Sequence, residues 1–522
     1  MATLTGAPHD VEEIAPLQLE AGQNLSSSAA PVRIALFIFV VFQFFYMLTS
    51  TGRVRTADEY NTLYMTESLV LRGSTAIPQA VQLHNFYGRF DLQGEPRAAY
   101  PPGQAVLCMP WYAFGQYVLM RLPGVPSADR DFVVWFSSCL SSATFSALTV
   151  MFFFLLLTGL GIPVGPSFLA TALLGIATPV FAYSGWLFSE PLSAAIFMGV
   201  ALLMFGRRSK SLVDLRIAGI AGVVLGLAVW VRPTNVLAIG VFAVAILARD
   251  RKAGWRAALV LCMTSAVGVL ALLSRNTALF GSAFEFGYPK PVPGSGIDNS
   301  FDTPIATGLY GLLLSPGKSV FIFAPPIILA AAGLRRLWRM ERGIATVATL
   351  FPAAYSILFA QYAHWEGGYC AGPRYLVPSI ALFCIGLGPA LEAAPRLVKK
   401  LAVGLLAVGA VVQCITLATS FLEDQAPARG HYYDTHWHYR FSYSLAGQIQ
   451  IFLKYLRAGQ SHKLGLGWDR WFVFLHVAGV SYVTLCVIGI VMVAGLIIGV
   501  TGLALSLRRT GAPGSVLRSR AV

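Results

Sequence analysis

The feature that most constrains this chain is a series of about a dozen long apolar stretches separated by short polar segments. A membrane core of ~30 Å needs ~20 consecutive apolar residues per helix. Hydrophobic residues make up 56% of the chain and charged residues only 12%, which is unlike a soluble globular protein. The sequence therefore predicts an all-α polytopic membrane protein with no separate soluble domain.

The basic residues are concentrated between the apolar stretches. The formal net charge is +14, and half of the 38 lysines and arginines lie in five short segments. These segments span residues 207–216, 249–256, 335–342, 396–400 and 508–520. Enrichment of basic residues in short cytoplasmic loops is a topology signal. We therefore expect the five segments on the cytoplasmic side, and no nucleic acid partner.

Placing all five basic segments on one side requires an even number of spans between successive segments. Residues 33–50 form the first predicted span, a signal anchor that leaves the N-terminus inside. Four further apolar stretches precede the basic segment at 207, and they are residues 104–120, 132–157, 163–182 and 189–206. Parity allows only three of them to cross. We expect the first not to cross, because it is rich in Trp and Tyr, contains Pro110 and suits the membrane interface.

The resulting topology has about twelve transmembrane helices and both termini in the cytoplasm. Residues 1–32 are polar and acidic and then rich in Ser and Ala, which predicts a disordered cytoplasmic tail, and residues 507–522 form a basic cytoplasmic tail. Residues 33–506 form the transmembrane domain between them. Its outer loops are residues 51–131, 281–316 and 421–470, and the first of these is expected to carry interfacial helices.

Charged residues at the ends of apolar stretches fall on the outer side in this topology. They are Asp58, Glu59, Glu190, Arg232, Arg275, Glu366 and Arg374. Charge at membrane depth is costly and commonly marks a pathway or a site. The functional side is therefore predicted to be extracytoplasmic.

The first outer loop opens with the acidic pair Asp58 and Glu59, followed by a short amphipathic stretch at residues 63–70 and by Gly73. This pattern predicts a short helix that ends at Gly73. Adjacent side chains on a helix point about 100° apart, so the two carboxylates are not expected to share one role. One can face a cavity at membrane level while the other is paired or solvated. An acidic helix start, stabilised by the helix dipole, is the structural alternative.

Several outer-side motifs follow one another in an order that resembles a known family. They are the acidic pair with Tyr60, Glu67, Leu69 and Gly73, the YPPG of 100–103, the YSGWLFSE of 183–190, the WVRPT of 230–234, Arg275 with the LFG of 279–281, and the HWEGGYCAGPRY of 364–375. In this order they resemble the polyprenyl-phosphate-sugar-dependent glycosyltransferases of the C-type fold, which include the protein O-mannosyltransferases and aminoarabinose transferases. The resemblance covers about residues 33–420.

The resemblance implies an integral-membrane glycosyltransferase on the outer side of a bacterial-type plasma membrane. Its partners would be a polyprenyl-phosphate sugar donor, membrane lipid and an acceptor that is a lipid, a glycan or a protein. The family's catalytic base corresponds to Asp58, with Glu59 as the second candidate, and inversion at the anomeric carbon is implied as well. A single carboxylate suits this chemistry, because phosphate is already a good leaving group and only the acceptor hydroxyl needs a base.

The donor phosphate would need a cation, and arginine gives bidentate, permanently charged recognition. The outer-side candidates are Arg97, Arg275 and Arg374. Family members often carry a lysine directly before the Pro-Pro pair, whereas this chain has Tyr100 there. This departure favours transfer of the phosphate role to Arg97 or to one of the other two arginines. A helix cap paired with Glu366 is the structural alternative for Arg374.

Further candidates for substrate binding come from the same motifs. They are Tyr60, Tyr100, Glu190, Glu285, His364 and Glu366. Glu190 also has a structural interpretation, as an acid at a helix N-terminus. Arg232 is interpreted as a residue of a turn between helices, paired with an acid such as Glu190. The aromatic neighbours of Glu285 suit either a sugar or the interfacial belt.

Neither the cysteines nor the histidines predict a metal site. The seven cysteines include no CxxC pair. Residues 431–440, HYYDTHWHYR, hold His431, Asp434, His436 and His438, but their spacing matches no standard zinc site. The aromatic content of this segment favours an acceptor-recognition or interfacial loop. We expect no cofactor, and a divalent metal ion is not indicated.

Other classes of membrane protein share this composition. A transporter or flippase of lipid-linked saccharides would commonly show internal repeats and broken helices at the midplane. This chain shows no repeat, and its charged residues gather at one face. A glycan ligase would also act outside and would share the long late loop. The order of the motifs favours the transferase over both, and the density of outer charge disfavours a scaffold without catalytic activity.

Overall fold

The computed structural model describes residues 17–127, 130–206, 214–290, 299–368, 370–418, 445–457 and 470–509. Its first helices, with η for 3-10 helices, are α1 (Leu17–Thr49), α2 (Ala57–Arg72), α3 (Pro78–Gln82), α4 (Gly103–Tyr117), η1 (Leu119–Arg121), α5 (Arg130–Gly159), α6 (Val164–Ala177), α7 (Pro179–Ala182), η2 (Tyr183–Gly185), α8 (Ser189–Phe205), α9 (Leu215–Val231), η3 (Pro233–Asn235), α10 (Val236–Arg249) and α11 (Gly254–Phe280). The later helices are α12 (Ile305–Leu314), α13 (Val320–Phe323), α14 (Ile327–Met340), α15 (Arg342–Ala360), η4 (Arg374–Leu376), α16 (Val377–Phe383), η5 (Cys384–Gly386), α17 (Leu387–Glu392), α18 (Arg396–Ala418), α19 (Leu445–Arg457), α21 (Trp471–Val477) and α22 (Tyr482–Arg509).

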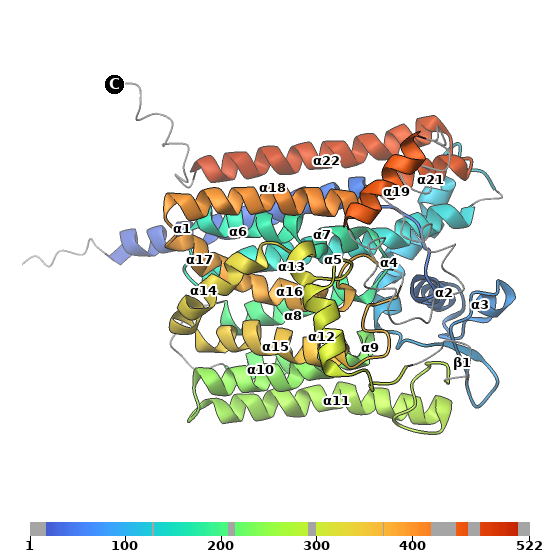
Figure 1. The fold of residues 1–522 in the computed structure, drawn as a ribbon, viewed down its shortest axis with the longest axis horizontal. Coiled ribbons are helices and arrows are strands. Elements are labelled where there is room, and N and C mark those ends of the chain that lie inside the picture. The colour runs from blue at the N-terminus through green and yellow to red at the C-terminus, as the bar shows by residue number, and fades with distance from the viewer. Residues whose placement is uncertain are drawn as a thin grey trace, which may run out of the picture.

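The long helices lie side by side and run along the same axis of the molecule (Figure 1). Seven of the described helical segments are long and apolar enough to cross a membrane, and α6 with α7 and η2 makes an eighth if the pair, bent by 55°, counts as one span. Helices α8, α9 and α12, and η3 with α10, are shorter apolar segments. The predicted multi-pass membrane protein is therefore confirmed, whereas the number of twelve spans stays a prediction.

The segment predicted not to cross forms α4, which has 15 residues. At ~1.5 Å per residue it is about 22 Å long, shorter than the ~30 Å membrane core. It packs between α2 and α5. Helix α10, in a segment predicted to cross, has only 14 residues, so the interfacial placement of residues 104–120 stays a prediction.

Several segments predicted as a tail, a loop or a single span contain helices that the sequence did not indicate. The tail predicted over residues 1–32 is helical from Leu17, where α1 begins. Outer loop 281–316 contains the apolar helix α12. The span expected before the basic segment at 335–342 is divided into α13 and α14, because Pro325 and Pro326 cannot continue a helix. Outer loop 421–470 contains α19, while most of that loop, including residues 431–440, lies outside the described residues.

The all-α prediction also misses a small antiparallel hairpin in the first outer loop. Strands β1 (Gly88–Phe90) and β2 (Pro96–Ala98) pair with Arg89 opposite Arg97. Asp91 stabilises the turn, since its Oδ1 accepts hydrogen bonds from the backbone N–H groups of Gln93 and Glu95, both at 2.9 Å. The Leu92 N–H donates to the Leu279 carbonyl at 2.9 Å, which joins the hairpin to the end of α11.

Small residues bring the membrane helices close together. A Cβ atom on Gly268 of α11 would lie 2.7 Å from the carbonyl carbon of Gly226 in α9, so the two backbones touch at this point. Such small-residue contacts are a common way to pack helices in a bilayer, where no hydrophobic effect drives them together. Helices α9 and α11 thereby form one side of the bundle, and the hairpin rests on its end.

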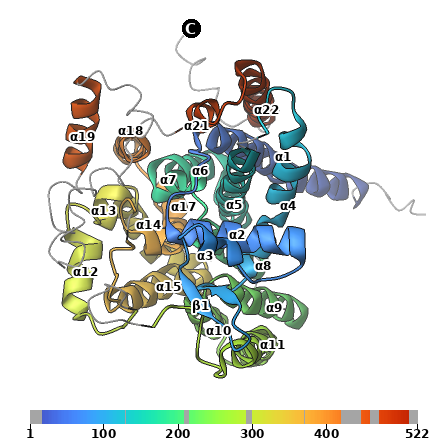
Figure 2. The same ribbon diagram turned by 90° about the vertical axis from the view of Figure 1, so that its right-hand side faces the viewer.

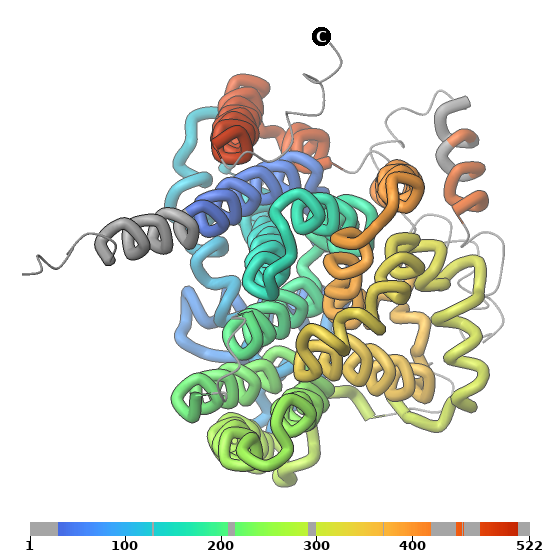
Figure 3. Tube along the Cα trace, turned by 90° about the vertical axis from the view of Figure 1, so that its left-hand side faces the viewer, coloured from blue at the N-terminus to red at the C-terminus, as the bar shows by residue number. Residues whose placement is uncertain are grey.

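The two ends of the bundle differ. The turns that join α10 to α11, α14 to α15 and α17 to α18, which hold basic segments, lie at the left end in Figure 1. Helices α2 and α3 and the hairpin lie at the right end, and they are in front in Figure 2. Figure 3 shows the opposite end, with the helix ends and their connections. The described basic turns thus face away from the first outer loop.

Candidate functional site

Helix α2 sets the positions of the acidic pair. Thr56 is its N-cap, and a capping box joins the Thr56 side chain to the Glu59 backbone and the Glu59 side chain to the Thr56 backbone. The helix ends at Gly73, which has a left-handed backbone with φ of 63°. The helix end predicted at Gly73 is therefore confirmed. Two defined ends fix the rotation of α2, and with it the directions of Asp58 and Glu59.

Glu59 is buried and its carboxylate is used inside the protein. Its Oε2 accepts hydrogen bonds from the backbone N–H groups of Arg55 and Thr56, both at 3.1 Å, and its Oε1 accepts from the Leu187 N–H at 3.1 Å. Burial raises the pKa of Glu59, and nearby Arg55 and these N–H donors lower it in part. The carboxylate thus joins the start of α2 to the segment before α8, on a different side of the helix from Asp58.

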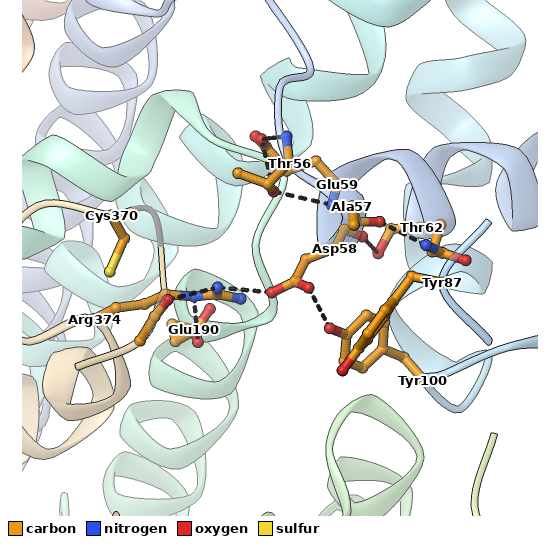
Figure 4. A network of polar contacts seen from close by, with 12 residues as sticks. Thr56, Ala57, Asp58, Glu59, Thr62, Tyr87, Tyr100, Glu190, Cys370 and Arg374 are labelled. Atoms are coloured by element: carbon orange, nitrogen blue, oxygen red, sulfur yellow. Dashed lines mark hydrogen bonds and ion pairs between the residues drawn. The ribbon is translucent and has the colours of Figure 1, made fainter. Parts of the chain in front are cut away.

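Asp58 lies between a cation and a phenol (Figure 4). Its Oδ2 is 2.7 Å from Nη1 of Arg374, and its Oδ1 accepts a hydrogen bond from the Tyr100 hydroxyl. Burial and the Asp58 carboxylate raise the pKa of Tyr100 well above its usual value, so this phenol stays protonated and donates. Residues that are 42 and 316 positions from Asp58 in the sequence therefore meet at one carboxylate.

A second carboxylate continues the network beyond Arg374. Glu190 Oε1 is 3.0 Å from Nε of Arg374 and 2.6 Å from Nη1 of Arg232. Only 1% of the Glu190 side chain is exposed. Its Oε2 is buried and has no hydrogen-bond partner within the described ranges. The order Asp58, Arg374, Glu190, Arg232 alternates in charge, and Glu190 Oε2 remains an acceptor that no described residue uses.

Aromatic rings support both arginines. The Arg374 guanidinium carbon lies 3.7 Å from the ring centroid of Phe188, and that of Arg232 lies 4.5 Å from Tyr375. Cation–π contacts of this kind hold a guanidinium in place. The Tyr100 ring packs edge-on against Tyr288, with ring centroids 5.6 Å apart. The site therefore combines fixed charges with an aromatic wall.

The remaining candidates lie elsewhere or have structural partners. Arg97 pairs with Asp91 at 2.7 Å inside the hairpin, and Glu285 pairs with Arg89 at 3.0 Å. Among the described residues no ion pair joins Arg275 to Asp58 or to any other acid. Of the three arginines considered for the phosphate, Arg374 is the one that contacts Asp58 in this structure.

Three substrate-binding candidates surround the network without contacting Asp58. His364 Nδ1 is 3.4 Å from Glu366 Oε1, and Glu366 is buried. The structural alternative, Arg374 paired with Glu366, is not what is seen, because Arg374 pairs with Asp58 and Glu190 instead. Tyr60 stacks on Tyr64 with centroids 5.8 Å apart, which gives it a packing role. The predicted pairing of Arg232 with Glu190 is confirmed.

The sequence reasoning missed a buried lysine close to this site. Lys318 follows α12, has an exposed fraction of 0% and donates from Nζ to the Cys370 carbonyl at 2.6 Å. A lone lysine inside an otherwise apolar stretch is costly at membrane depth, so the sequence carried a signal for it. Tyr288 was missed as well, because no sequence pattern indicates its contact with the distant Tyr100.

Within the described ranges no group of three His, Cys, Asp or Glu side chains is arranged to hold a metal ion. The polar groups at the site can instead bind an anion, accept a proton and accept a hydrogen bond. Asp58 can accept a proton, Arg374 and Arg232 can bind an anion, and Glu190 can accept a hydrogen bond from a hydroxyl or an amine.

Among the solved structures similar to this chain are two of ArnT from Cupriavidus metallidurans. The crystal structure bound to undecaprenyl phosphate has a TM-score of 0.46 and 13% identity, over 88% of this chain and 77% of the other. The apo crystal structure has a TM-score of 0.46 and 12% identity, over 88% and 78%. No family model and no curated protein matches the sequence.

Proposed function

We propose that this protein is an integral-membrane glycosyltransferase that moves a sugar from a polyprenyl phosphate to an acceptor hydroxyl on the extracytoplasmic side. The observation that carries the proposal is the contact of Asp58 with Arg374, at 2.7 Å. Such a transfer needs a base for the acceptor and a cation for the phosphate, and both must reach the same anomeric carbon. A carboxylate in direct contact with an arginine meets this requirement.

In the proposed step the acceptor hydroxyl oxygen attacks the anomeric carbon, and the bond from that carbon to the phosphate oxygen breaks. The hydroxyl proton passes to the Asp58 carboxylate, and the electron pair of the broken bond leaves with the phosphate. Attack from the side opposite the phosphate inverts the anomeric carbon. The Tyr100 hydroxyl, which donates to Asp58, keeps the carboxylate oriented for the proton transfer.

Arg374 and Arg232 bind the phosphate in this proposal. Arg374 uses Nη1 and Nε for Asp58 and Glu190, and no hydrogen bond in the described part of the chain uses its Nη2. Both Nη2 protons are then available to the phosphate oxygens, in the charge-assisted geometry that arginine favours. Because charge accumulates on the departing phosphate, fixed cations here stabilise the transition state.

The buried Oε2 of Glu190 supports recognition of the sugar. An unpartnered carboxylate oxygen in a buried position is costly, and a ligand hydroxyl or amino group would satisfy it. The half-buried rings of Tyr100 and Tyr288 offer an apolar face for the sugar ring beside it. Glu59, Arg97, Arg275, Glu285 and Tyr60 have no part in the chemistry of this proposal, and neither does a cofactor.

The decisive experiment offers several polyprenyl-phosphate sugars and acceptors to the purified protein and measures release of polyprenyl phosphate. Release that depends on both substrates and is lost in Arg374→Met supports the proposal. A parallel assay in vesicles follows movement of lipid-linked sugar across the bilayer. Movement without release of polyprenyl phosphate would favour the transporter over the transferase.

A further inference from the structure

Lys318 is fully buried, although its side chain carries an ammonium group. It lies in the turn between α12 and α13, where its own N–H donates to the Ser315 hydroxyl at 3.2 Å. Its Nζ donates to the Cys370 carbonyl at 2.6 Å and lies 3.4 Å from the Cys370 sulfur. Among the described residues no carboxylate pairs with it. An ammonium without a carboxylate partner is costly to bury, so a structural reason for its position is needed.

The Cys370 carbonyl belongs to a segment that is bound from several sides. The next carbonyl along the chain, that of Ala371, accepts a hydrogen bond from the Tyr183 hydroxyl at 2.7 Å. Gly372 then adopts a left-handed backbone with φ of 59°, and a Cβ there would lie 2.6 Å from the Phe323 ring. Two successive carbonyls are thus fixed by side chains from two other elements, just before the chain reaches Arg374.

The position of Arg374 depends on this segment. Its Nη1 is 3.4 Å from the Gly367 carbonyl, and a Cβ on Gly367 would lie 2.9 Å from the Cys370 sulfur and 3.1 Å from Cβ of Arg374. Gly367 therefore lies against both Cys370 and Arg374. A shift of the Cys370 carbonyl would move the backbone from which the Arg374 guanidinium reaches Asp58.

We propose that Lys318 is a positioning residue for phosphate binding, acting through Arg374. The lysine fixes the Cys370 carbonyl, the Tyr183 hydroxyl fixes the Ala371 carbonyl, and together they orient the guanidinium between Asp58 and Glu190. Lys318 itself touches neither the substrate nor the reacting atoms. The inference rests on the proposed function, because it assigns Arg374 to the donor phosphate.

The test compares binding of undecaprenyl phosphate, as the probe, to purified wild-type protein and to variants in detergent. Lys318→Met keeps the aliphatic stem and removes the ammonium, and Lys400→Met, at an exposed position, is the matched control. We expect Lys318→Met to bind about tenfold more weakly, as loss of a buried hydrogen bond from a charged donor would give. Arg374→Met should weaken binding at least as much, and the double variant should bind no more weakly than Arg374→Met alone.

Unfolding temperatures of all variants separate positioning from general damage. If Lys318→Met does not fold, Tyr183→Phe carries the test, since it keeps the ring and removes the neighbouring hydrogen bond, with an expected loss of about threefold. Binding by Lys318→Met, or by Tyr183→Phe where it stands in, within twofold of wild type would overturn the inference. So would a double variant whose losses simply multiply.

The proposed function fails separately, if wild-type protein does not bind the probe. The double-mutant cycle is then measured by the free energies of unfolding of wild type, Lys318→Met, Arg374→Met and the double variant. Coupling between Lys318→Met and Arg374→Met in stability would then support the positioning of Arg374 by Lys318, and additive effects would overturn it.

Discussion

The two adjacent carboxylates of α2 lie in contrasting surroundings. Glu59 is enclosed by backbone N–H donors, which hold it in place and occupy both of its oxygens. Asp58 instead meets two side chains, Arg374 and Tyr100, and 26% of its own side chain is exposed. A carboxylate that is to exchange a proton with a ligand needs such exposure. We therefore propose that Asp58 takes part in the reaction and that Glu59 holds helix α2 in place.

Asp58→Asn tests the first assignment. The amide keeps the shape of the side chain but cannot take up the acceptor proton, so turnover should fall by about 10²–10⁴-fold. Binding of polyprenyl phosphate should change much less, because Arg374 and Arg232 remain. Steady-state kinetics together with a binding titration separate the two effects. Turnover close to wild type would remove Asp58 from the mechanism.

Glu59→Gln tests the second assignment. One oxygen becomes an NH₂ group that faces N–H donors, so a buried hydrogen bond is lost and a repulsion is added. We expect the free energy of unfolding to fall by about 1–3 kcal/mol. Glu95→Gln, at an exposed position of the hairpin, should leave it unchanged within about 0.5 kcal/mol. A Glu59→Gln protein that unfolds like wild type but has no turnover would instead make Glu59 catalytic.

The sequence predicts part of the site at this scale and misses the rest for a physical reason. Asp58, Glu190 and Arg374 stand out because charge at the end of an apolar stretch is unusual. The partner of each charge depends on tertiary contacts, which spacing does not reveal. Arg97 is therefore a candidate from the sequence beside Arg275 and Arg374, although it pairs with Asp91 inside the hairpin.

At the scale of elements, α2 shows how local signals fix a functional helix. Thr56 and Glu59 form the capping box at its start, and Gly73 forms its left-handed end. These signals are local in sequence, so the end of the helix could be predicted. The hairpin that follows is held by the hydrogen bonds of Asp91 to its own turn and of the Leu92 N–H to the end of α11. No pattern of residues typical of strands predicts it. Three-residue strands are too short for a period of two to be visible.

Alanine substitutions at two glycines should change the stability in opposite directions, and they test the left-handed end of α2. Gly73 has a φ of 63°, so alanine there should cost about 1 kcal/mol of stability, although no atom lies within 4 Å of the added Cβ. Gly240 lies inside α10 with equally open space and an ordinary backbone. Gly240→Ala should stabilise by about 0.5–1 kcal/mol. Unfolding of the purified variants in detergent gives both values, and equal effects at the two positions would contradict the left-handed end at Gly73.

At the scale of the whole molecule, the charge pattern and the fold agree on a division into two ends. The turns after α10, α14 and α17 hold basic segments and lie at the end opposite to α2 and the hairpin (Figure 1). Asp58, Glu190 and Arg374 meet at the end that carries α2. Because lysine and arginine are retained on the cytoplasmic side, the end that carries the site is the one expected outside.

Cysteine labelling in a variant without its seven native cysteines tests this topology. Arg121→Cys follows α4 and Lys290→Cys follows α11, and both positions are exposed in the structure. If α4 does not cross, an impermeant maleimide should label both in intact cells. Arg251→Cys, in the turn between α10 and α11, should be labelled only after permeabilisation. Labelling of Arg121→Cys that requires permeabilisation would mean that α4 crosses the membrane. The parity of the basic segments would then fail, and with it the placement of Asp58 on the outer side.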